Sequence, residues 1–153
     1  MARHYFYEID RQGVLWHNGT ALTDAAFLRT FFARLQSDEH AAFPGYPFVS
    51  RCAGEPNYVR AEVTPIVFRS LDADGLLHGN GEVRIRFDAT SLRIDPHDRL
   101  FHGAPVSGLG FLTPAVTMEL APAIEAVDGG FVFVAGERRV HIARTTDPGP
   151  SPH

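Results

Sequence analysis

One stretch of the chain has helical periodicity, whereas most of the remaining apolar residues follow a period of two. The helical stretch is TDAAFLRTFFARLQ, and its apolar residues recur at i, i+1, i+4, i+5 and i+8: Phe27, Leu28, Phe31, Phe32 and Leu35. This spacing places them on one face of a helix. Thr23 is positioned to cap the first turn. We therefore predict that residues 24–36 form the longest helix, with Phe27, Phe31 and Leu35 packed against a sheet.

Short alternating runs bounded by Gly, Pro and Asp predict strands along the rest of the chain. In GEVRIRFDA, for example, Val83, Ile85 and Phe87 alternate with charged residues. Similar runs are YFYEID, VLWH and TAL before the helix, and PFVSRC, NYVRAE, PIVFRSL, RLFHGAP, VTMEL, FVFVAG and ERRVHIAR after it. The predicted fold class is α+β, with a mainly antiparallel β-sheet and one principal helix.

The length and composition favour one domain. A chain of 153 residues that is 44% hydrophobic is long enough to bury one substantial core. We expect a single α+β domain over residues 1–144 and a disordered, Pro-rich tail over residues 145–153. DRQGVLWHNG and DPHDRLFHGAP share the order Asp, turn, apolar pair, His and Gly. This similarity raises the alternative of two related half-repeats.

The composition argues against several chemistries. All fourteen basic residues are Arg, so a Schiff-base lysine and a Walker-type phosphate loop are absent from this chain. The single Cys52 excludes an internal disulfide and a multi-cysteine metal cluster. Neither HxH nor HExxH occurs, and the sequence predicts no metal site and no cofactor.

Charge and hydropathy narrow the expected partners and location. The net charge of −4 comes without a basic stripe, so nucleic acid is not expected as a partner. No apolar run has the length of a signal peptide or a bilayer span, so we expect a cytoplasmic protein with no membrane partner.

The segment SRCAGEPNYVR concentrates polar side chains around a predicted turn at residues 53–56. Together with His102, its polar residues and the next carboxylate are the candidate ligand-binding residues: Glu55, Asn57, Arg60, Glu62 and His102. Period-two spacing keeps Arg60 and Glu62 on one face of a strand, where the guanidinium is suited to clamp a polar ligand. We expect this face to be on the same side of the sheet as His102. The alternative interpretation is an exposed cross-strand charge ladder.

Two functions remain open on this basis. The first is a non-enzymatic ligand-binding or regulatory module, whose partner is an unknown small molecule or protein. The alternative is a small enzyme that uses Cys52 or His102 with Glu55 or Glu62. No signature of a cysteine enzyme surrounds Cys52, and we predict that its side chain contributes to packing.

Several of these segments, in order, resemble an uncharacterised protein family, a domain of unknown function with bacterial members and animal members expected in mitochondria. The segments are YFYEID, FFARL, PFVSRC, NYVR, PIVF, RLFHGAP and MELAP, and they cover about residues 4–122. The resemblance implies that the five candidate residues sit at motif positions, and it implies no activity. GVLWHNGTALTDAAFLRTFFARL and VTPIVF are also similar to a second bacterial family of unknown function. That family is built from repeated α/β motifs and is proposed to bind ligands or take part in signalling.

Overall fold

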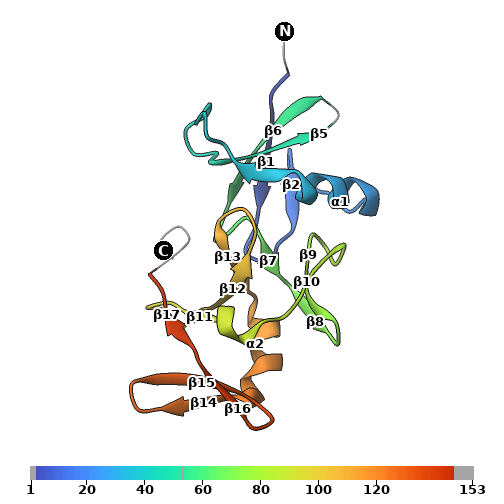
Figure 1. Ribbon diagram of the computed structural model, residues 1–153. Coiled ribbons are helices and arrows are strands. Elements are labelled where there is room, and N and C mark those ends of the chain that lie inside the picture. The colour runs from blue at the N-terminus through green and yellow to red at the C-terminus, as the bar shows by residue number, and fades with distance from the viewer. Residues whose placement is uncertain (1–2, 53, 147–153) are drawn as a thin grey trace.

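The computed structural model describes residues 3–52 and 54–146, and its first sheet is formed by the N-terminal part of the chain (Figure 1). The strands of this sheet are β1 (Tyr5–Ile9), β2 (Leu15–His17), β3 (Thr20–Ala21), β4 (Leu35–Ser37), β5 (Phe48–Cys52) and β6 (Glu55–Ala61). Their order across the sheet is β3-β2-β1-β6-β5-β4. Helix α1 (Ala25–Ala33) packs on this sheet, where the Phe31 and Tyr7 ring centroids are 5.1 Å apart.

Three further sheets follow. A five-stranded sheet in the order β17-β11-β12-β13-β7 contains β7 (Val67–Phe68), β11 (Arg93–Ile94), β12 (Leu100–Ala104), β13 (Gly108–Leu112) and β17 (Ala143–Arg144). One three-stranded sheet contains β8 (Ser70–Asp72), β9 (Gly75–His78) and β10 (Val83–Ile85), and another contains β14 (Ile124–Val127), β15 (Gly130–Ala135) and β16 (Arg138–His141). Helix α2 (Pro114–Leu120) and the 3₁₀ turns η1 (Ala89–Ser91) and η2 (Ala121–Ala123) connect them. The β14–β16 sheet lies at the opposite end of the molecule from the first sheet (Figure 1).

The predicted α+β class is confirmed, but the sheets are mixed. Most strand pairs are antiparallel, whereas β1 with β6, β7 with β13 and β11 with β17 are parallel. Parallel pairing was not predicted because it joins segments far apart in the sequence, which period-two alternation does not reveal.

Helix α1 is the longer α-helix of the described residues, as predicted, although it is shorter than 24–36. The buried face carries Leu28, Phe31 and Phe32. The predicted cap at Thr23 is wrong, because the Asp24 side chain accepts the hydrogen bond from the Phe27 N–H at 2.8 Å. At its other end the helix stops at Ala33, and the buried Leu35 belongs to β4.

The prediction of a strand at VTMEL is wrong, because these residues belong to α2. Thr113 is its N-cap and accepts from the Val116 N–H, and Pro114 occupies the first turn. Threonine followed by proline is a helix-start signal, since proline at the first helical position lacks an N–H that would in any case be unpaired. Val116 and Leu120, four residues apart, are the buried residues of α2.

The two similar segments noted in the sequence form hairpins with the same hydrogen bonds. Asp10 Oδ1 accepts from the N–H groups of Gln12 and Val14 at 2.9 and 3.0 Å. Asp95 Oδ1 accepts likewise from the residues two and four positions later, at 3.0 and 2.8 Å. In both hairpins an Ile and a Leu pair on either side of the turn, Ile9 with Leu15 and Ile94 with Leu100.

A buried connection joins the first sheet to the five-stranded sheet. Residues 63–68 are all buried, and Thr64 links this connection to β13. Its hydroxyl donates to the Ile66 carbonyl at 2.6 Å and accepts from the Phe111 N–H at 2.9 Å. One cluster of buried residues extends from Ile9 of β1 to Phe133 of β15. The core is therefore continuous across the sheets.

The sequence predicts that the domain ends at residue 144. Most of the predicted tail, residues 147–153, lies outside the described residues, but Thr145 still donates its N–H to the Ile94 carbonyl at 2.9 Å. Ordered structure thus extends at least to this residue. Neither helix of the described chain is long and apolar enough to cross a bilayer.

Candidate functional site

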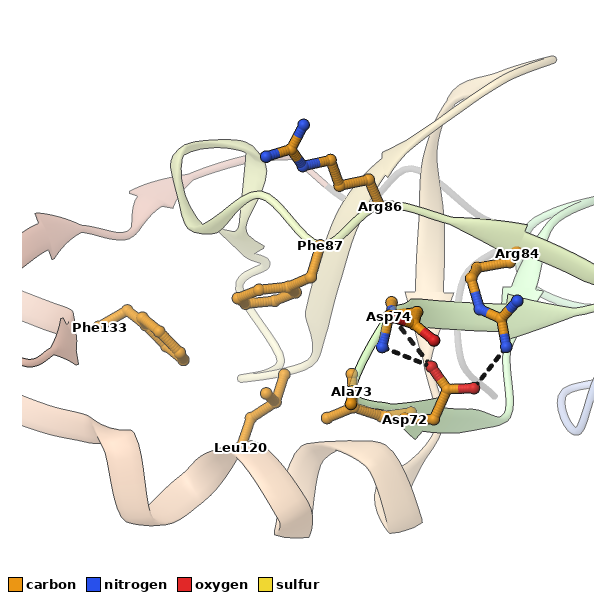
Figure 2. Close-up of a pocket in the computed structure, with 10 residues that line it drawn as sticks. Asp72, Ala73, Asp74, Arg84, Arg86, Phe87, Leu120 and Phe133 are labelled. Atoms are coloured by element: carbon orange, nitrogen blue, oxygen red, sulfur yellow. Dashed lines mark hydrogen bonds and ion pairs between the residues drawn. The ribbon is translucent and has the colours of Figure 1, made fainter.

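Two adjoining hollows lie between the β8–β10 sheet and the C-terminal β14–β16 sheet. Their volumes are about 740 and 600 Å³, and both are lined by Arg86, Phe87 and Phe133. We call the combined depression the Arg86 groove. Its other lining side chains include Asp72, Asp74, Arg84 and Leu120 in the first hollow (Figure 2). Asp88 and Arg138 line the second hollow.

The middle of the groove is apolar. The Phe87 and Phe133 ring centroids are 5.3 Å apart with a tilt of 54° between the rings. Leu120, at the end of α2, lies below both rings in Figure 2. These side chains come from three separate segments of the chain, so the apolar surface exists only in the folded molecule.

An ion pair forms one end of the groove. Asp72 Oδ2 accepts from Arg84 at 2.6 Å, and Oδ1 accepts from the N–H groups of Asp74 and Gly75 (Figure 2). These hydrogen bonds hold the pKa of Asp72 below its usual value, and the bond from Arg84 contributes most to this shift. The side chains of Asp72 and Arg84 are therefore already engaged with each other.

Arg86 is placed differently from Arg84, its neighbour two positions earlier. Its side chain extends away from the Asp72–Arg84 pair (Figure 2). Among residues 3–52 and 54–146, no hydrogen-bond or ion-pair partner is found for its guanidinium. Adjacent side chains of a strand point to opposite faces. Because β10 ends at Ile85, Arg86 and Phe87 are free of this alternation, and both line the groove. The groove thus offers an unpaired cation beside an aromatic surface.

The other end of the groove is formed by Asp88 and Arg138. Asp88 caps η1: its Oδ1 accepts from the Thr90 hydroxyl at 2.7 Å and from the Thr90 N–H at 3.0 Å. These bonds, with smaller contributions from His102 and Arg138, lower the pKa of Asp88. The carboxylate is therefore held in its charged form by the protein itself.

His102 of β12 contacts two residues of the groove, Phe87 and Asp88. Its ring is stacked on Phe87 with centroids 5.4 Å apart, and its Nε2 accepts from the Asp88 N–H at 2.9 Å. Nδ1 lies 2.7 Å from the Gly103 carbonyl oxygen. Burial is the main reason that the pKa of His102 is below the usual value for histidine.

The other four predicted residues lie on β6 of the first sheet or just after it. Asn57 is buried, and its side-chain amide donates to the carbonyl groups of Ser50 and Glu55 at 2.8 and 3.2 Å. It therefore holds the β5–β6 hairpin together. The hairpin is tighter than predicted, because Glu55 pairs with Cys52 and Pro56 already belongs to β6. Ala53 lies outside the described residues.

Arg60 and Glu62 pair with different partners. Arg60 donates to Glu8 of the neighbouring β1 at 2.8 Å, and Arg11 donates to Glu62 at 2.9 Å. These contacts agree with the alternative interpretation of exposed ion pairs across the sheet.

The expectation that Arg60 and Glu62 share one side of a sheet with His102 is wrong. Arg60 belongs to the first sheet and His102 to the five-stranded sheet, and Glu62 directly follows β6. The buried connection of residues 63–68 separates the two sheets. The spacing of residues along a single strand does not indicate which sheet the chain enters next.

Cys52 is buried in the core, with its Sγ 3.2 Å from the Ser50 hydroxyl. This confirms its predicted contribution to packing. Within the described part of the chain, no group of three His, Cys, Asp or Glu side chains gathers in a way that would hold a metal ion.

Sequence reasoning missed most of the groove. The alternation in GEVRIRFDA identified β10, which contains Arg84 and ends one residue before Arg86. It did not indicate that β15 and β16 face the end of this strand. Phe133 and Arg138 were assigned only to a terminal hairpin. A pair of arginines two residues apart at the end of a half-exposed strand was the available signal.

Comparison with known proteins places this fold among domains of unknown function. Two solved structures are similar. A DUF1285 family protein from Silicibacter pomeroyi DSS-3 has a TM-score of 0.62 at 16% identity, with 93% of this chain and 83% of that chain covered. A DUF1285 family protein from Shewanella baltica OS155 has a TM-score of 0.54 at 16% identity, with 77% of this chain and 91% of that chain covered. At this identity the likeness concerns the fold alone, and it agrees with the expected similarity to a second family of unknown function.

The sequence itself matches the profile of a family described as "Domain of unknown function (DUF4505)" over residues 1–135, which is most of the chain. This match agrees with the resemblance seen in the motifs from YFYEID to MELAP. The chain therefore belongs to the DUF4505 family.

Proposed function

We propose that this protein is a non-enzymatic binding module and that its ligand is a small organic anion held in the Arg86 groove. The single observation that carries the proposal is the guanidinium of Arg86, which lacks a partner among the described residues and adjoins the Phe87–Phe133 surface. A ligand pocket commonly combines an apolar lining with a few polar groups that fix orientation. An anionic group on an apolar body satisfies both parts of the groove.

The position of Arg86 favours an anion over a cation. Arg84 is paired with Asp72, whereas Asp74 lines the first hollow and Asp88 the second as carboxylates. Arg86 and Arg138 both line the second hollow, to which the Asp72–Arg84 pair does not contribute, and guanidinium groups bind carboxylate, sulfonate and phosphate oxygens in pairs of hydrogen bonds.

The test uses 8-anilinonaphthalene-1-sulfonate, an aromatic anion whose fluorescence rises when it leaves water. Binding to the wild-type protein at neutral pH should saturate at one site. Arg86→Gln should weaken binding by about fivefold or more, because one charge-assisted hydrogen bond contributes about 1–3 kcal/mol.

Arg144→Gln is the matched control, since Arg144 is an exposed arginine of β17 that does not line the groove. It removes the same charge and should leave the affinity unchanged. Circular dichroism must show that both variants are folded, because the probe also binds partly unfolded chains. Equal affinity of the two variants would overturn the proposal, since the probe would then be bound on another surface.

We also propose that the chain consists of two related halves. Each half runs through three strands, a helix and a strand meander, and the first strand of each half pairs in parallel with the last strand, β1 with β6 and β11 with β17. The matching Asp10 and Asp95 hairpins support this proposal. It predicts that the two hairpins superpose in a crystal structure, with each carboxylate and its two amide donors in equivalent positions.

A further inference from the structure

The imidazole of His102 is hydrogen-bonded to the backbone of Asp88, the N-cap residue of η1. Its Nε2 accepts from the Asp88 N–H at 2.9 Å, so this nitrogen must carry a lone pair. Nδ1 then carries the hydrogen and donates to the Gly103 carbonyl, 2.7 Å away. The two partners together assign the neutral Nδ1–H tautomer.

The same ring supports the apolar surface of the groove. One face of His102 is stacked on Phe87 at an angle of 27°, and Phe68 of β7 contacts it edge-on at 5.7 Å. Only 2% of His102 is exposed, so the ring has little freedom to move independently. The positions of the Phe87 ring and of the Asp88 backbone are thus tied to one side chain.

Protonation would break this arrangement. A proton taken from solvent bonds to the Nε2 lone pair, and the Asp88 N–H then loses its acceptor and faces another donor. The Asp88 carboxylate interacts electrostatically with the ring, and Arg138 of β16 interacts in turn with Asp88. The other faces are apolar or lack a side chain: Phe68 of β7, Phe87, and Gly110 opposite on β13.

We propose that His102 is a positioning residue that keeps the Arg86 groove competent to bind its anion while the imidazole is neutral, and that releases residues 87 and 88 when it is protonated. The inference rests on the proposed function of the groove, and it adds a regulation by pH. Because burial lowers the pKa of His102, the loss of binding should occur below the usual titration range of histidine.

The test follows 8-anilinonaphthalene-1-sulfonate affinity from about pH 7.5 down to about pH 4.0, over the part of this range in which circular dichroism confirms the fold. The wild-type affinity should fall by about tenfold or more over this range. In His102→Gln the side-chain amide oxygen substitutes for Nε2 as an acceptor but does not titrate, so its affinity should stay nearly constant. His102→Phe retains a ring against Phe87 but has no acceptor, and it should bind weakly at both pH values. His78→Leu removes another buried histidine and should keep the wild-type pH response.

Nuclear magnetic resonance separates this inference from the proposed function. A long-range ¹H–¹⁵N spectrum of the wild-type protein should show the Nδ1–H tautomer of His102. In a pH titration, the Asp88 amide and Phe87 ring signals should shift with the same midpoint pH as His102, with or without probe.

If these signals follow His102 but Arg86→Gln binds the probe normally, the groove is not the anion site and the inference fails with it. If Arg86→Gln loses binding but His102→Gln shows the wild-type pH response, the anion site stands and the role of His102 is refuted. Different midpoints for His102 and for probe affinity refute it as well, even if neither His102 variant folds.

Discussion

At the scale of single residues, His78 is an unusual feature of the core. Only 2% of it is exposed, and neither ring nitrogen has a hydrogen-bond partner among the described residues. Its surroundings are aromatic: the ring centroids of Phe32 and Phe68 lie 5.5 and 5.9 Å from that of His78, and both rings are nearly perpendicular to it. A buried polar group without a partner costs about 1–3 kcal/mol. Burial also lowers the pKa of His78 from 6.5 to about 4.

Because the folded protein holds His78 in its neutral form, the free energy of unfolding should decrease in acid. The unfolded chain takes up a proton as the pH falls through 6.5, whereas the folded protein resists it until about pH 4. Stability is full above the unfolded pKa and falls between these values, by up to about 3 kcal/mol. His78→Leu should raise the free energy of unfolding at pH 7, and the gain should be larger at about pH 4.5.

Urea unfolding at both pH values measures this effect. His141→Leu serves as the control, because His141 is exposed on β16 and its replacement should change stability little. A His78→Leu protein less stable than the wild type at both pH values would show that the cavity shape at this position matters more than the unpaired nitrogens.

The candidate site was only partly predictable at this scale. His102 was selected from its motif, and it does adjoin the groove. Its role depends on the Asp88 N–H, fourteen residues earlier, and on the Phe87 ring. Arg60 looked equally suited to a ligand, but Glu8 of another strand neutralises it. Whether a polar side chain is free or paired is decided by the neighbouring strands, which local spacing does not specify.

At the scale of elements, periodicity located α1 and most strands, but the ends were less well predicted. Helix α1 has two candidate caps, Thr23 and Asp24, and both residue types suit the position. The structure selects Asp24, whose carboxylate accepts from the Phe27 N–H. In α2 the start signal of Thr113 and Pro114 was outweighed by the β-branched residues that follow. Seven residues are too few for the helical period to be distinctive.

The cap assignment leads to a direct comparison of two neighbouring substitutions. Asp24→Ala should lower the free energy of unfolding by about 0.5–2 kcal/mol, because it leaves a helix N–H without its acceptor and removes a negative charge from the positive end of the helix. Thr23→Ala should change it by less than about 0.5 kcal/mol. Chemical unfolding of the two variants measures both values. Equal losses, or a larger loss for Thr23→Ala, would mean that the helix begins one residue earlier than observed.

At the scale of the whole molecule, the first sheet and the five-stranded sheet are packed through the buried connection of residues 63–68. Gly110 of β13 lies where this connection comes closest to the five-stranded sheet. A Cβ atom at this position would lie 2.6 Å from Cε2 of Phe68 and 2.9 Å from the Ile66 carbonyl oxygen. The first sheet contacts the same connection, since a Cβ atom on Gly13 would meet Val67 at 3.0 Å. A side chain at position 110 should therefore disturb the packing of both the five-stranded sheet and the first sheet against this connection.

Gly110→Ala should destabilise the protein by about 1–3 kcal/mol, because the neighbouring atoms include backbone that cannot move aside freely. Trp16 is the single tryptophan and lies in β2, so its fluorescence reports the first sheet, while far-ultraviolet circular dichroism reports all the sheets. If residues 1–144 form one domain, Gly110→Ala should lower the urea midpoint of both signals equally, although Gly110 and Trp16 belong to different sheets.

Gly130→Ala in β15 is the control, since the added methyl group would meet only the ring of the exposed His141, at 3.3 Å. A Gly110→Ala protein in which the Trp16 transition keeps its wild-type midpoint while the circular dichroism separates into two steps would show two domains. The continuous core cluster and the Thr64 hydrogen bonds would then hold the sheets side by side without making them unfold together.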